Sequence, residues 1–505
     1  MDLIGRVLDE LESGQALRQS KKRASAGDRR FPGNAEILKR YHNEVREGLR
    51  EKNPEIERLL VLNKVRSESG VVTITVMTKP FPCPGRCIYC PTEENVPKSY
   101  LSNEPPVLRA IHTQYDAYGQ FLYRLKALKN TGHRSEKIEL IIKGGTWTAY
   151  PKAYQEAFIQ RCLDAANETA STSLEDAQAI NETAQHRVVG LTIETRPDSV
   201  SPEEIQQLRL LGVTRVELGV QSLDEAVLKA SIRDHGIKDI RTATRLLKDA
   251  GFKVAYHMMP NSPGSTLETD LESLRTTFED PDFKPDGMKI YPCVVVKSAA
   301  LYGLWKKGEY RSYTDDELVA LLVEAKKHVP RYTRLERVIR DVPATSIESG
   351  CTISNLRERV LTKLKEQGFS CHCLRCRQIR DSATGDFQFH SEEFEASGAQ
   401  EFFLSFEDAG RERLAAFLRL RISGDHADVR ELHTYGRQLP IEPGSADDTS
   451  GQHRGFGKQL LNAAEELAFE RFNCTKVRVI SGVGARAYYR KLGYRLEDTY
   501  MVKDQ

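Results

Sequence analysis

The chain has 505 residues, which is long enough to bury two or more hydrophobic cores, so more than one domain is expected. Its 74 Lys and Arg residues against 72 Asp and Glu residues exclude a strong global field, so a nucleic-acid or membrane partner has to be argued from local clusters. No signal peptide or membrane span is visible, which predicts a cytoplasmic protein whose ten cysteines stay reduced, and clustered cysteines are therefore interpreted first as metal ligands.

Residues 1–60 are expected to form a basic N-terminal arm with helices. The stretch MDLIGRVLDELESG carries acids inside an apolar pattern and predicts a short amphipathic helix. A cluster of six cations with one acid follows, at Arg18, Lys21, Lys22, Arg23, Arg29 and Arg30. Charge runs of this kind are usually solvated faces, but a basic arm can also neutralise the phosphates of a structured RNA.

Residues 61–345 are expected to form a partial (β/α)6 barrel. Six apolar, β-rich runs lie between residues 71 and 296: VVTITVM, KIELIIK, RVVGLTIE, RVELGV, KVAYHMM and GMKIYPCVVV. Each of the first five is followed by a plausible helix, and that alternation is typical of a parallel sheet wrapped by helices. The segments after these strands are rich in Gly, Pro, Cys and polar residues, which is where barrel enzymes carry their chemistry, although each segment alone has the composition of an ordinary turn.

The loop KPFPCPGRCIYCP after the first run holds Cys83, Cys87 and Cys90. Structural clusters and structural zinc normally take four ligands, so three thiolates leave one metal position open to a small molecule. The spacing and the following Tyr-Cys-Pro resemble the radical S-adenosylmethionine (SAM) signature. The resemblance implies a [4Fe–4S] cluster whose free iron binds SAM. A zinc site with a distant fourth ligand, or unrelated cysteines, are the alternatives.

Other residues at the strand ends fit the same cofactor. The resemblance implies SAM-binding roles for Gly144, Gly145, Thr146, Glu194, Arg196 and Gln221. Thr146 stands where many radical SAM proteins carry an acid. Lys289 in KIYP is a candidate catalytic residue, and Tyr291 shares its strand end. Each of these polar side chains, taken alone, is more often a salt bridge or a cap at the barrel rim than a cofactor ligand.

Residues 297–380 are strongly basic and are predicted to be mainly helical. KKHVPRYTRLERVIR places Tyr332 between Arg331 and Arg334, so the ring is predicted to stack on an RNA base beside cations that contact phosphates. Residues 346–394 are expected to be a small linker in which Cys371, Cys373 and Cys376 bind structural zinc. The fourth ligand is left open among Cys293, Cys351, His372 and His390, and buried ordinary cysteines are the alternative.

Residues 395–505 are expected to form a second α/β domain. FFLSFED, LAAFLRLRIS and ADVRELHTYG alternate as antiparallel strands before QHRGFGKQLLNAAEELA, where a glycine-rich loop opens a helix. With KVRVISGVGARAYYRKLGY, this resembles the GNAT acetyltransferase fold, which implies acetyl-CoA. Its pyrophosphate loop is then Gln452, His453, Arg454, Gly455, Phe456, Gly457 and Lys458, and Tyr488 and Tyr489 are candidate catalytic residues. Glu431, His433 and Tyr435 are further candidates for the acyl site.

Motifs running through nearly the whole chain, among them KPFPCPGRCIYCP, KGGTWTAYP, ELGVQSL, RELHTYG and GQHRGFGKQLL, resemble the catalytic subunit of Elongator and its stand-alone prokaryotic relatives. Two departures are the close spacing of the first two cysteines and IRDHG in place of Arg-Gly-His. The resemblance implies an acyltransferase that uses a SAM-derived 5′-deoxyadenosyl radical to join the methyl carbon of acetyl-CoA to C5 of the tRNA wobble uridine, with thioester hydrolysis leaving a carboxymethyl group.

Two other functions remain open from the sequence. One is a protein lysine acetyltransferase with a structural or SAM-sensing barrel, and the other is a tRNA-binding scaffold without turnover. The need for accessory subunits or a second copy of the chain is also open. An inert scaffold has no need of an incompletely ligated metal, which favours the radical chemistry.

Overall fold

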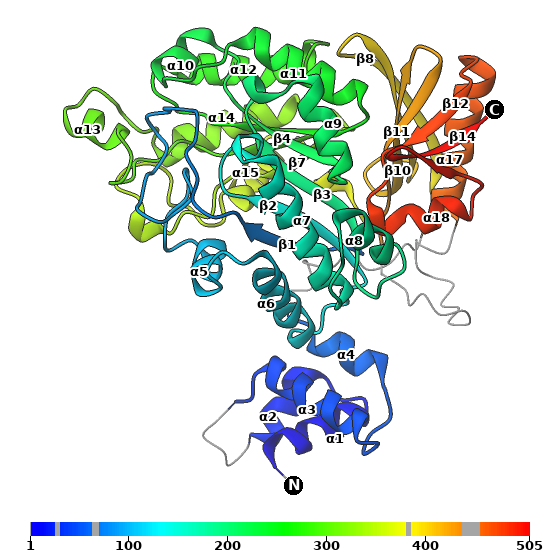
Figure 1. Ribbon diagram of the computed structural model, residues 1–505. Coiled ribbons are helices and arrows are strands. Elements are labelled where there is room, and N and C mark those ends of the chain that lie inside the picture. The colour runs from blue at the N-terminus through cyan, green and yellow to red at the C-terminus, as the bar shows by residue number, and fades with distance from the viewer. Residues whose placement is uncertain (1, 26–30, 63–69, 380–384, 437–454) are drawn as a thin grey trace.

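The computed structural model describes residues 2–25, 31–62, 70–379, 385–436 and 455–505. Figure 1 shows a helical unit at the N-terminus, a central barrel-like sheet wrapped by helices and a second sheet near the C-terminus. Within the described residues, no helix is long and apolar enough to cross a membrane.

The N-terminal unit is a small helical bundle with its own core. Its helices are α1 (Leu3–Glu12), α2 (Leu17–Ala24), α3 (Asn34–Arg46) and α4 (Pro54–Leu60). Apolar side chains from α1, α3 and α4 share one buried cluster that includes Leu8, Tyr41 and Leu60. Because apolar residues recur on one face of α1, the predicted amphipathic helix is confirmed.

The first sheet has seven parallel strands in chain order, so each helical crossover joins neighbouring strands. The strands are β1 (Val72–Met77), β2 (Lys137–Lys143), β3 (Arg187–Thr195), β4 (Arg215–Gln221), β5 (Lys253–Met258), β6 (Gly287–Ile290) and β7 (Arg334–Arg337). The six predicted strands are confirmed. The mainly helical prediction for 297–380 is wrong at β7, a four-residue strand whose charged sequence hides its place at the sheet edge.

Helices cover the outer face of this sheet and bury its large apolar core. They are α6 (Ala117–Asn130), α7 (Lys152–Asn167), α8 (Leu174–Asn181), α9 (Pro202–Leu210), α10 (Glu225–Ala230), α11 (Ile237–Asp249), α12 (Leu267–Glu279), α14 (Asp315–Lys327) and α15 (Leu356–Glu366). Three further helices, α5 (Pro105–His112), α13 (Leu301–Lys306) and α16 (Leu374–Arg377), pack in other apolar clusters. β1 and β7 are the two unpaired edges, so the barrel is partial, as predicted.

The second sheet has the order β13-β14-β12-β11-β10-β9-β8. Its strands are β8 (Gln388–Ala396), β9 (Ala399–Glu407), β10 (Leu414–Ser423), β11 (His426–Thr434), β12 (Lys476–Val479), β13 (Arg495–Glu497) and β14 (Tyr500–Asp504), and its helices include α17 (Phe456–Glu466) and α18 (Arg486–Arg490). The three predicted antiparallel strands correspond to β9, β10 and β11. Among the described strands of this sheet, only the neighbours β11 and β12 are parallel, and their pairing ends at Val429 with Val479.

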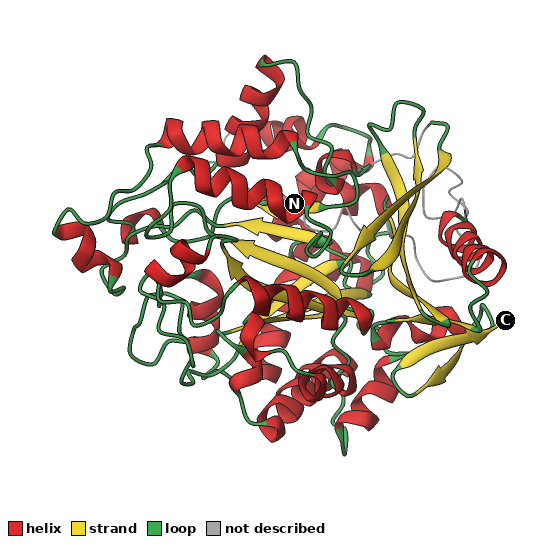
Figure 2. Ribbon diagram, turned by 90° about the horizontal axis from the view of Figure 1, so that it is seen from above, coloured by secondary structure: helices red, strands yellow, loops and turns green. Residues whose placement is uncertain are grey.

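The second sheet packs on the end of the barrel where its strands begin, and the barrel strands point away from it in Figure 2. Arg430 on β11 donates to the Phe252 carbonyl oxygen at 3.0 Å and to the Asp286 carboxylate, and both partners lie just before barrel strands. At Gly482 an added Cβ would lie 2.2 Å from the Val189 carbonyl oxygen. A side chain there would therefore force the two domains apart.

Candidate functional site

A cavity of about 940 Å³ runs along the inside of the barrel. It is lined by residues near the start of the strands, such as Glu139 and Arg215, and by residues beyond their carboxyl ends. Among the predicted site residues that line it are Cys83, Cys87, Cys90, Gly145, Thr146, Glu194, Arg196, Gln221, Lys289 and Arg334. The fold thus brings together side chains that are more than two hundred residues apart in the sequence.

The loop with the three cysteines lies beyond the carboxyl end of β1 and is tied to two other segments. The Ile88 N–H donates to the Ser231 carbonyl oxygen at 3.2 Å, and the Ile88 carbonyl oxygen accepts from Leu301 N–H at 2.8 Å. The Cys90 thiol donates to the Cys87 sulfur, and this bond together with nearby Arg233 lowers the pKa of Cys87. A thiol that ionises readily is a ready metal ligand.

Two arginines surround Cys87. Arg233 donates from Nη1 to the Cys87 sulfur at 3.3 Å. Arg196 holds Asp198 with two hydrogen bonds of 2.9 and 2.6 Å, but its Nη1 is buried with no partner in the structure. The Oε1 atom of Gln221 is also buried without a partner. Buried polar atoms left unpaired beside three thiols fit a charged ligand and a metal cluster bound in this cavity.

The turn after β2 depends on glycine. Gly144 has φ +137°, and an added Cβ would lie 1.9 Å from the Thr78 Oγ1 atom. Gly145 has φ +103° and lines the cavity, where an added Cβ would lie 3.7 Å from the Lys98 carbonyl oxygen. Thr146 then places its Oγ1 3.6 Å from the Cys83 sulfur. Only glycine tolerates this backbone without strain, so the turn brings the main chain close to the thiols.

A layer of paired charges crosses the barrel below the thiols. Glu217 is fully buried, and its carboxylate accepts from Lys289 and from His257 at 2.7 Å, with Arg215 at 3.0 Å. Burial lowers the pKa of Lys289, but Glu217 more than offsets this and raises it overall. Alongside, Lys143 pairs with Glu194 at 3.0 Å.

Lys143, Glu217 and His257 were not predicted from the sequence. The available signal was a charged residue at an inward position of an otherwise apolar strand. The ligand atoms of Glu194, Glu217 and His257 lie within 4.8 Å of one another, as a metal site requires. Because Lys143, Arg215 and Lys289 already balance these carboxylates, we interpret the group as an ion-pair layer.

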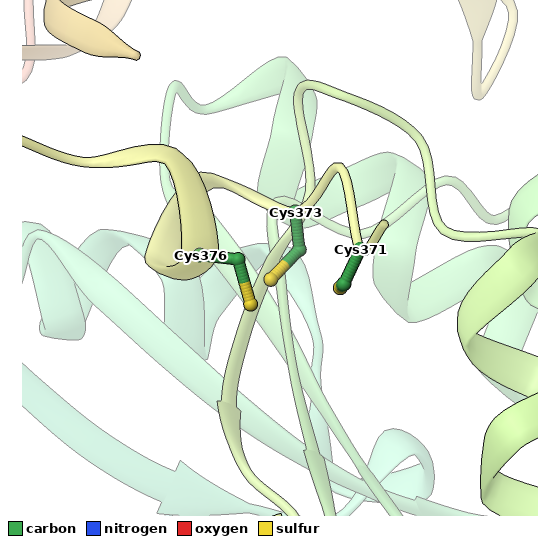
Figure 3. Close-up of side chains that lie close together, drawn as sticks. All are labelled: Cys371, Cys373 and Cys376. Carbon is green, nitrogen blue, oxygen red and sulfur yellow. The ribbon is translucent and has the colours of Figure 1, made fainter. Parts of the chain in front are cut away.

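The second cysteine cluster is compact. Figure 3 shows Cys371, Cys373 and Cys376 converging around α16, and their sulfurs all lie within 4.8 Å of one another. All three are free thiols, and Lys326 donates to the Cys371 sulfur at 3.2 Å. Cys376 is exposed, so one side of the group is open to a further ligand. Cys293 is not that ligand, because it packs beside Cys87 and Tyr89 in the barrel mouth.

The predicted pyrophosphate loop is described only from Gly455 onward, and Gln452, His453 and Arg454 lie outside the described residues. Gly455 caps α17 with φ +69°, followed by buried Phe456 and exposed Lys458. An added Cβ on Gly457 would lie 3.3 Å from the Tyr488 hydroxyl and 3.5 Å from Thr434 Oγ1. The helix start and the Tyr488 hydroxyl therefore lie side by side.

The two adjacent tyrosines of α18 have different surroundings. Tyr488 is 43% exposed, whereas Tyr489 is 7% exposed and packs in the core of the second domain. Tyr489 is therefore placed as a packing residue, and Tyr488 is the one that can meet a ligand. Glu431 on β11 pairs with Lys253 at 3.4 Å, and Tyr435, just after β11, accepts from Arg334 at 2.9 Å, so both face the barrel.

The predicted RNA-binding residues also separate into groups. Arg18, Lys22 and Arg23 are exposed on α2, whereas Lys21 is buried and donates to Asn34. Arg29 and Arg30 lie outside the described residues.

In the basic segment around Tyr332, Arg331 donates to the Arg411 carbonyl oxygen at 2.6 Å, and Arg334 lines the barrel cavity. The prediction that Tyr332 stacks on a base is wrong, because its ring is 5% exposed and stacks on Phe394 with centroids 4.1 Å apart.

Comparison with known protein families agrees with this geometry. Residues 82–276 match the radical SAM superfamily, residues 285–366 the radical SAM C-terminal domain and residues 371–494 the acetyltransferase (GNAT) family. The fold and the site define a radical SAM enzyme joined to a GNAT domain, and hence an acyltransferase.

Full-length relatives narrow this class. The chain is 42% identical over 534 residues to the tRNA uridine(34) acetyltransferase of Methanocaldococcus jannaschii, covering 99% of this chain and 97% of the relative. It is 39% identical over 471 residues to Elongator complex protein 3 of Homo sapiens, covering 87% and 85%. The chain belongs to the family of Elongator complex protein 3 and the tRNA uridine(34) acetyltransferases.

A solved structure supports the arrangement of the two domains. The archaeal Methanocaldococcus infernus Elp3 with an N-terminal deletion (1–46) superposes with a TM-score of 0.76 at 42% identity. The match covers 86% of this chain and 100% of that chain.

Proposed function

We propose that this protein modifies the wobble uridine of tRNA with a group taken from acetyl-CoA. The observation that carries the proposal is the set of three thiols, two arginines and a glycine turn around one cavity, in the same chain as a GNAT domain. The relatives named tRNA uridine(34) acetyltransferase support the choice of substrate. The ten free cysteines agree with a cytoplasmic location.

In this proposal Cys83, Cys87 and Cys90 hold a [4Fe–4S] cluster and leave one iron for SAM. When bound, the cluster and SAM would supply the radical chemistry that removes one hydrogen from the acetyl methyl group and one from uridine C5 as the two carbons are joined, and thioester hydrolysis would then leave a carboxymethyl group. The unpartnered Nη1 of Arg196 is suited to the SAM carboxylate, and Glu194 is suited to its ribose hydroxyls.

The protein's own groups bind, orient and shield the reactants. The backbone at Gly144 and Gly145 comes close enough to line the cofactor pocket, and Thr146 and Gln221 add polar contacts there. Lys289 is held charged by Glu217 at the cavity wall, where its ammonium can stabilise negative charge on the acyl or uridine oxygen.

The proposed acetyl-CoA site is the start of α17. The main-chain N–H groups after Gly455 and the helix dipole suit the pyrophosphate, with Gln452 to Lys458 as the loop. Tyr488 lies beside Gly457 and is proposed to act at the thioester. Tyr489 is proposed to support it through ring packing at 5.2 Å between centroids.

For tRNA, the exposed cations Arg18, Lys22 and Arg23 are proposed to contact phosphates, together with Arg29, Arg30 and Arg331. Arg334 lies deeper, at the cavity wall, and is proposed to meet the end of the substrate that enters the barrel. Cys371, Cys373 and Cys376 are proposed to bind structural zinc between the two domains, since three thiolates this close match tetrahedral ligand spacing.

The test is anaerobic reconstitution with iron, sulfide, reductant, SAM, acetyl-CoA and tRNA, followed by mass spectrometry of the tRNA nucleosides. A carboxymethyluridine that disappears in Cys87→Ala supports the proposal. If the protein were instead a protein lysine acetyltransferase, Cys87→Ala would remain fully active toward a protein amine, and SAM would not affect that activity. Deoxyadenosine formed without any uridine product would contradict the substrate assignment.

A further inference from the structure

Arg233 is the basic residue in direct contact with a thiol of the first cysteine trio. Its Nη1 atom lies 3.3 Å from the Cys87 sulfur, and its Nη2 atom donates to the Gly219 carbonyl oxygen at the end of β4. Nε is buried without a partner. The guanidinium is therefore fixed from the strand side and directs one N–H at sulfur.

The loop that carries Arg233 is built to hold it there. Ile232, the preceding residue, has φ +53°, a left-handed conformation that a β-branched residue adopts only under strain. The Arg233 N–H donates to the Leu228 carbonyl oxygen at 2.9 Å, and the Ser231 carbonyl oxygen accepts from Ile88 in the cysteine loop. The Ile88–Ser231 hydrogen bond thus joins the two loops next to the Arg233–Cys87 contact.

The other two thiols have neutral partners. The Cys83 sulfur lies 3.6 Å from the Thr146 hydroxyl, and Cys90 has a hydrogen bond with the Ser99 hydroxyl. Among the described residues, Cys87 is therefore the thiol of this trio that accepts a hydrogen bond from a charged side chain. Hydrogen bonds to cluster sulfurs and nearby charge are the protein's means of setting a reduction potential.

We propose that Arg233 tunes the reduction potential of the cluster held by Cys83, Cys87 and Cys90, by donating a charged hydrogen bond to the Cys87 sulfur. This inference rests on the proposed cluster site. Reduction adds one electron to a cluster that three thiolates already make negative, and a cation 3.3 Å from sulfur stabilises the more negative state. Arg233 is a positioning residue in this role, and the electron comes from an added low-potential reductant.

The experiment is an anaerobic redox titration of reconstituted protein without SAM, following the electron paramagnetic resonance signal of the reduced cluster. Arg233→Met, which removes the charge and the donors, is expected to shift the midpoint to more negative potential. At the midpoint of the unmodified protein, the ratio of reduced to oxidised cluster should fall about tenfold, which is about 59 mV for one electron. Arg233→Lys keeps the charge and is expected to have a midpoint close to that of the unmodified protein.

The matched control is Arg86→Met. Arg86 lies in the cysteine loop beside Cys87, but its side chain is 78% exposed and pairs with Asp234 rather than with sulfur. Its midpoint should equal that of the unmodified protein. Should Arg233→Met fail to hold iron and sulfide, Arg233→Gln keeps an N–H donor without the charge and should give an intermediate midpoint.

Equal midpoints for the unmodified protein and every cluster-containing Arg233 variant would overturn the proposal. So would an unchanged midpoint combined with weakened SAM binding, because Arg233 would then be a SAM ligand. Iron and sulfide analysis separates these results from failure of the proposed function. Absence of a cluster from the unmodified protein removes the cluster site itself, whereas a normal cluster with an unshifted midpoint removes only the role of Arg233.

Discussion

Glu217 lies in the middle of the barrel with no exposed surface and with Lys289, His257 and Arg215 around its carboxylate. Burial raises the pKa of Glu217, but Lys289 and Arg215 more than offset this and hold it well below its usual range. A buried carboxylate with two cationic partners is stable only as a complete group, because removing one member leaves unpaired charge in a poorly solvated interior.

Glu217→Gln is therefore expected to destabilise the protein by about 3–5 kcal/mol, since Lys289 and Arg215 lose their shared partner. Calorimetric melting would measure this as a lower transition temperature. Glu139→Gln is the control, because that side chain is 29% exposed and lies 3.6 Å from Arg215, so its loss should cost less than about 1 kcal/mol. Equal effects of the two changes would contradict the importance of burial.

The second cysteine group, Cys371, Cys373 and Cys376, is the proposed zinc site. Cys373→Ser is expected to lose bound zinc, because Cys373 is fully buried and its sulfur is within 4.8 Å of both other thiols. Elemental analysis of the purified protein measures the zinc content. Cys474→Ala, a buried cysteine outside this group, should leave the zinc content unchanged. Full zinc content in Cys373→Ser would rule out this cluster as the site.

At the scale of elements, two helices carry the proposed binding surfaces for acetyl-CoA and tRNA. The start of α17 faces Tyr488 and the end of β11, while α2 presents its cations on the N-terminal bundle. Both helices place charge or partial charge at a surface where a phosphate can approach.

Gly457→Val is expected to weaken acetyl-CoA binding about tenfold, or about 1.4 kcal/mol, because branched atoms would fill the space between α17, Tyr488 and Thr434. Isothermal titration calorimetry measures the affinity. Asn462→Ala, at an exposed position of the same helix, should bind normally. Unchanged affinity in Gly457→Val would place acetyl-CoA elsewhere.

Lys22→Glu and Arg23→Glu are each expected to weaken tRNA binding. The slope of log binding constant against log salt concentration should become shallower by about one unit for each phosphate that the protein no longer neutralises. Filter binding at several salt concentrations measures both. Arg46→Glu makes the same charge change at an exposed position of α3 and controls for net charge. Lys21→Ala should instead lower the stability of the bundle, because the Lys21 side chain is buried against Asn34.

At the scale of the whole molecule, the two domains are joined through buried ion pairs. Glu401 on β9 meets Lys248 on α11 at 3.2 Å and Arg421 on β10 at 3.0 Å, and Arg430 joins it to Asp286 before β6. These side chains are almost completely buried. Charged groups of this kind specify one docking geometry, because any shift of the domains would strand a charge without a partner.

Glu401→Gln is expected to destabilise the folded chain by about 3–5 kcal/mol at neutral pH. Burial raises the pKa of Glu401, but Arg430, Lys248 and Arg421 more than offset this and lower it from 4.5 to about 2. Its contribution to stability is thus fully present above about pH 4.5 and is lost as the pH falls toward 2.

Melting temperatures measured across that pH range test this, and the variant should show a flatter acid dependence than the unmodified protein. Glu393→Gln on neighbouring β8, whose carboxylate is 38% exposed and pairs with Arg471, is the control and should retain the normal profile. A parallel acid dependence in Glu401→Gln and the unmodified protein would contradict the assignment.

The amino-acid sequence by itself determined six of the seven barrel strands, three strands of the second sheet and the motifs Cys83 to Cys90 and Gly455 to Gly457. These are local signals, because strand periodicity, ligand spacing and glycine turns are set by neighbouring residues. The sequence missed β7, since a four-residue charged strand is defined only by its partner β6.

Only the tertiary structure decided which polar residues belong together. Tyr332 lies in a basic segment whose composition predicts exposure, yet its ring stacks on Phe394. Lys21 and Lys22 are neighbours in the sequence, but Lys21 is buried and Lys22 is exposed. Glu217 and Arg233 became visible as site residues through contacts with side chains far away in the chain. Burial and long-range pairing arise when distant segments pack together, and no local sequence window contains that information.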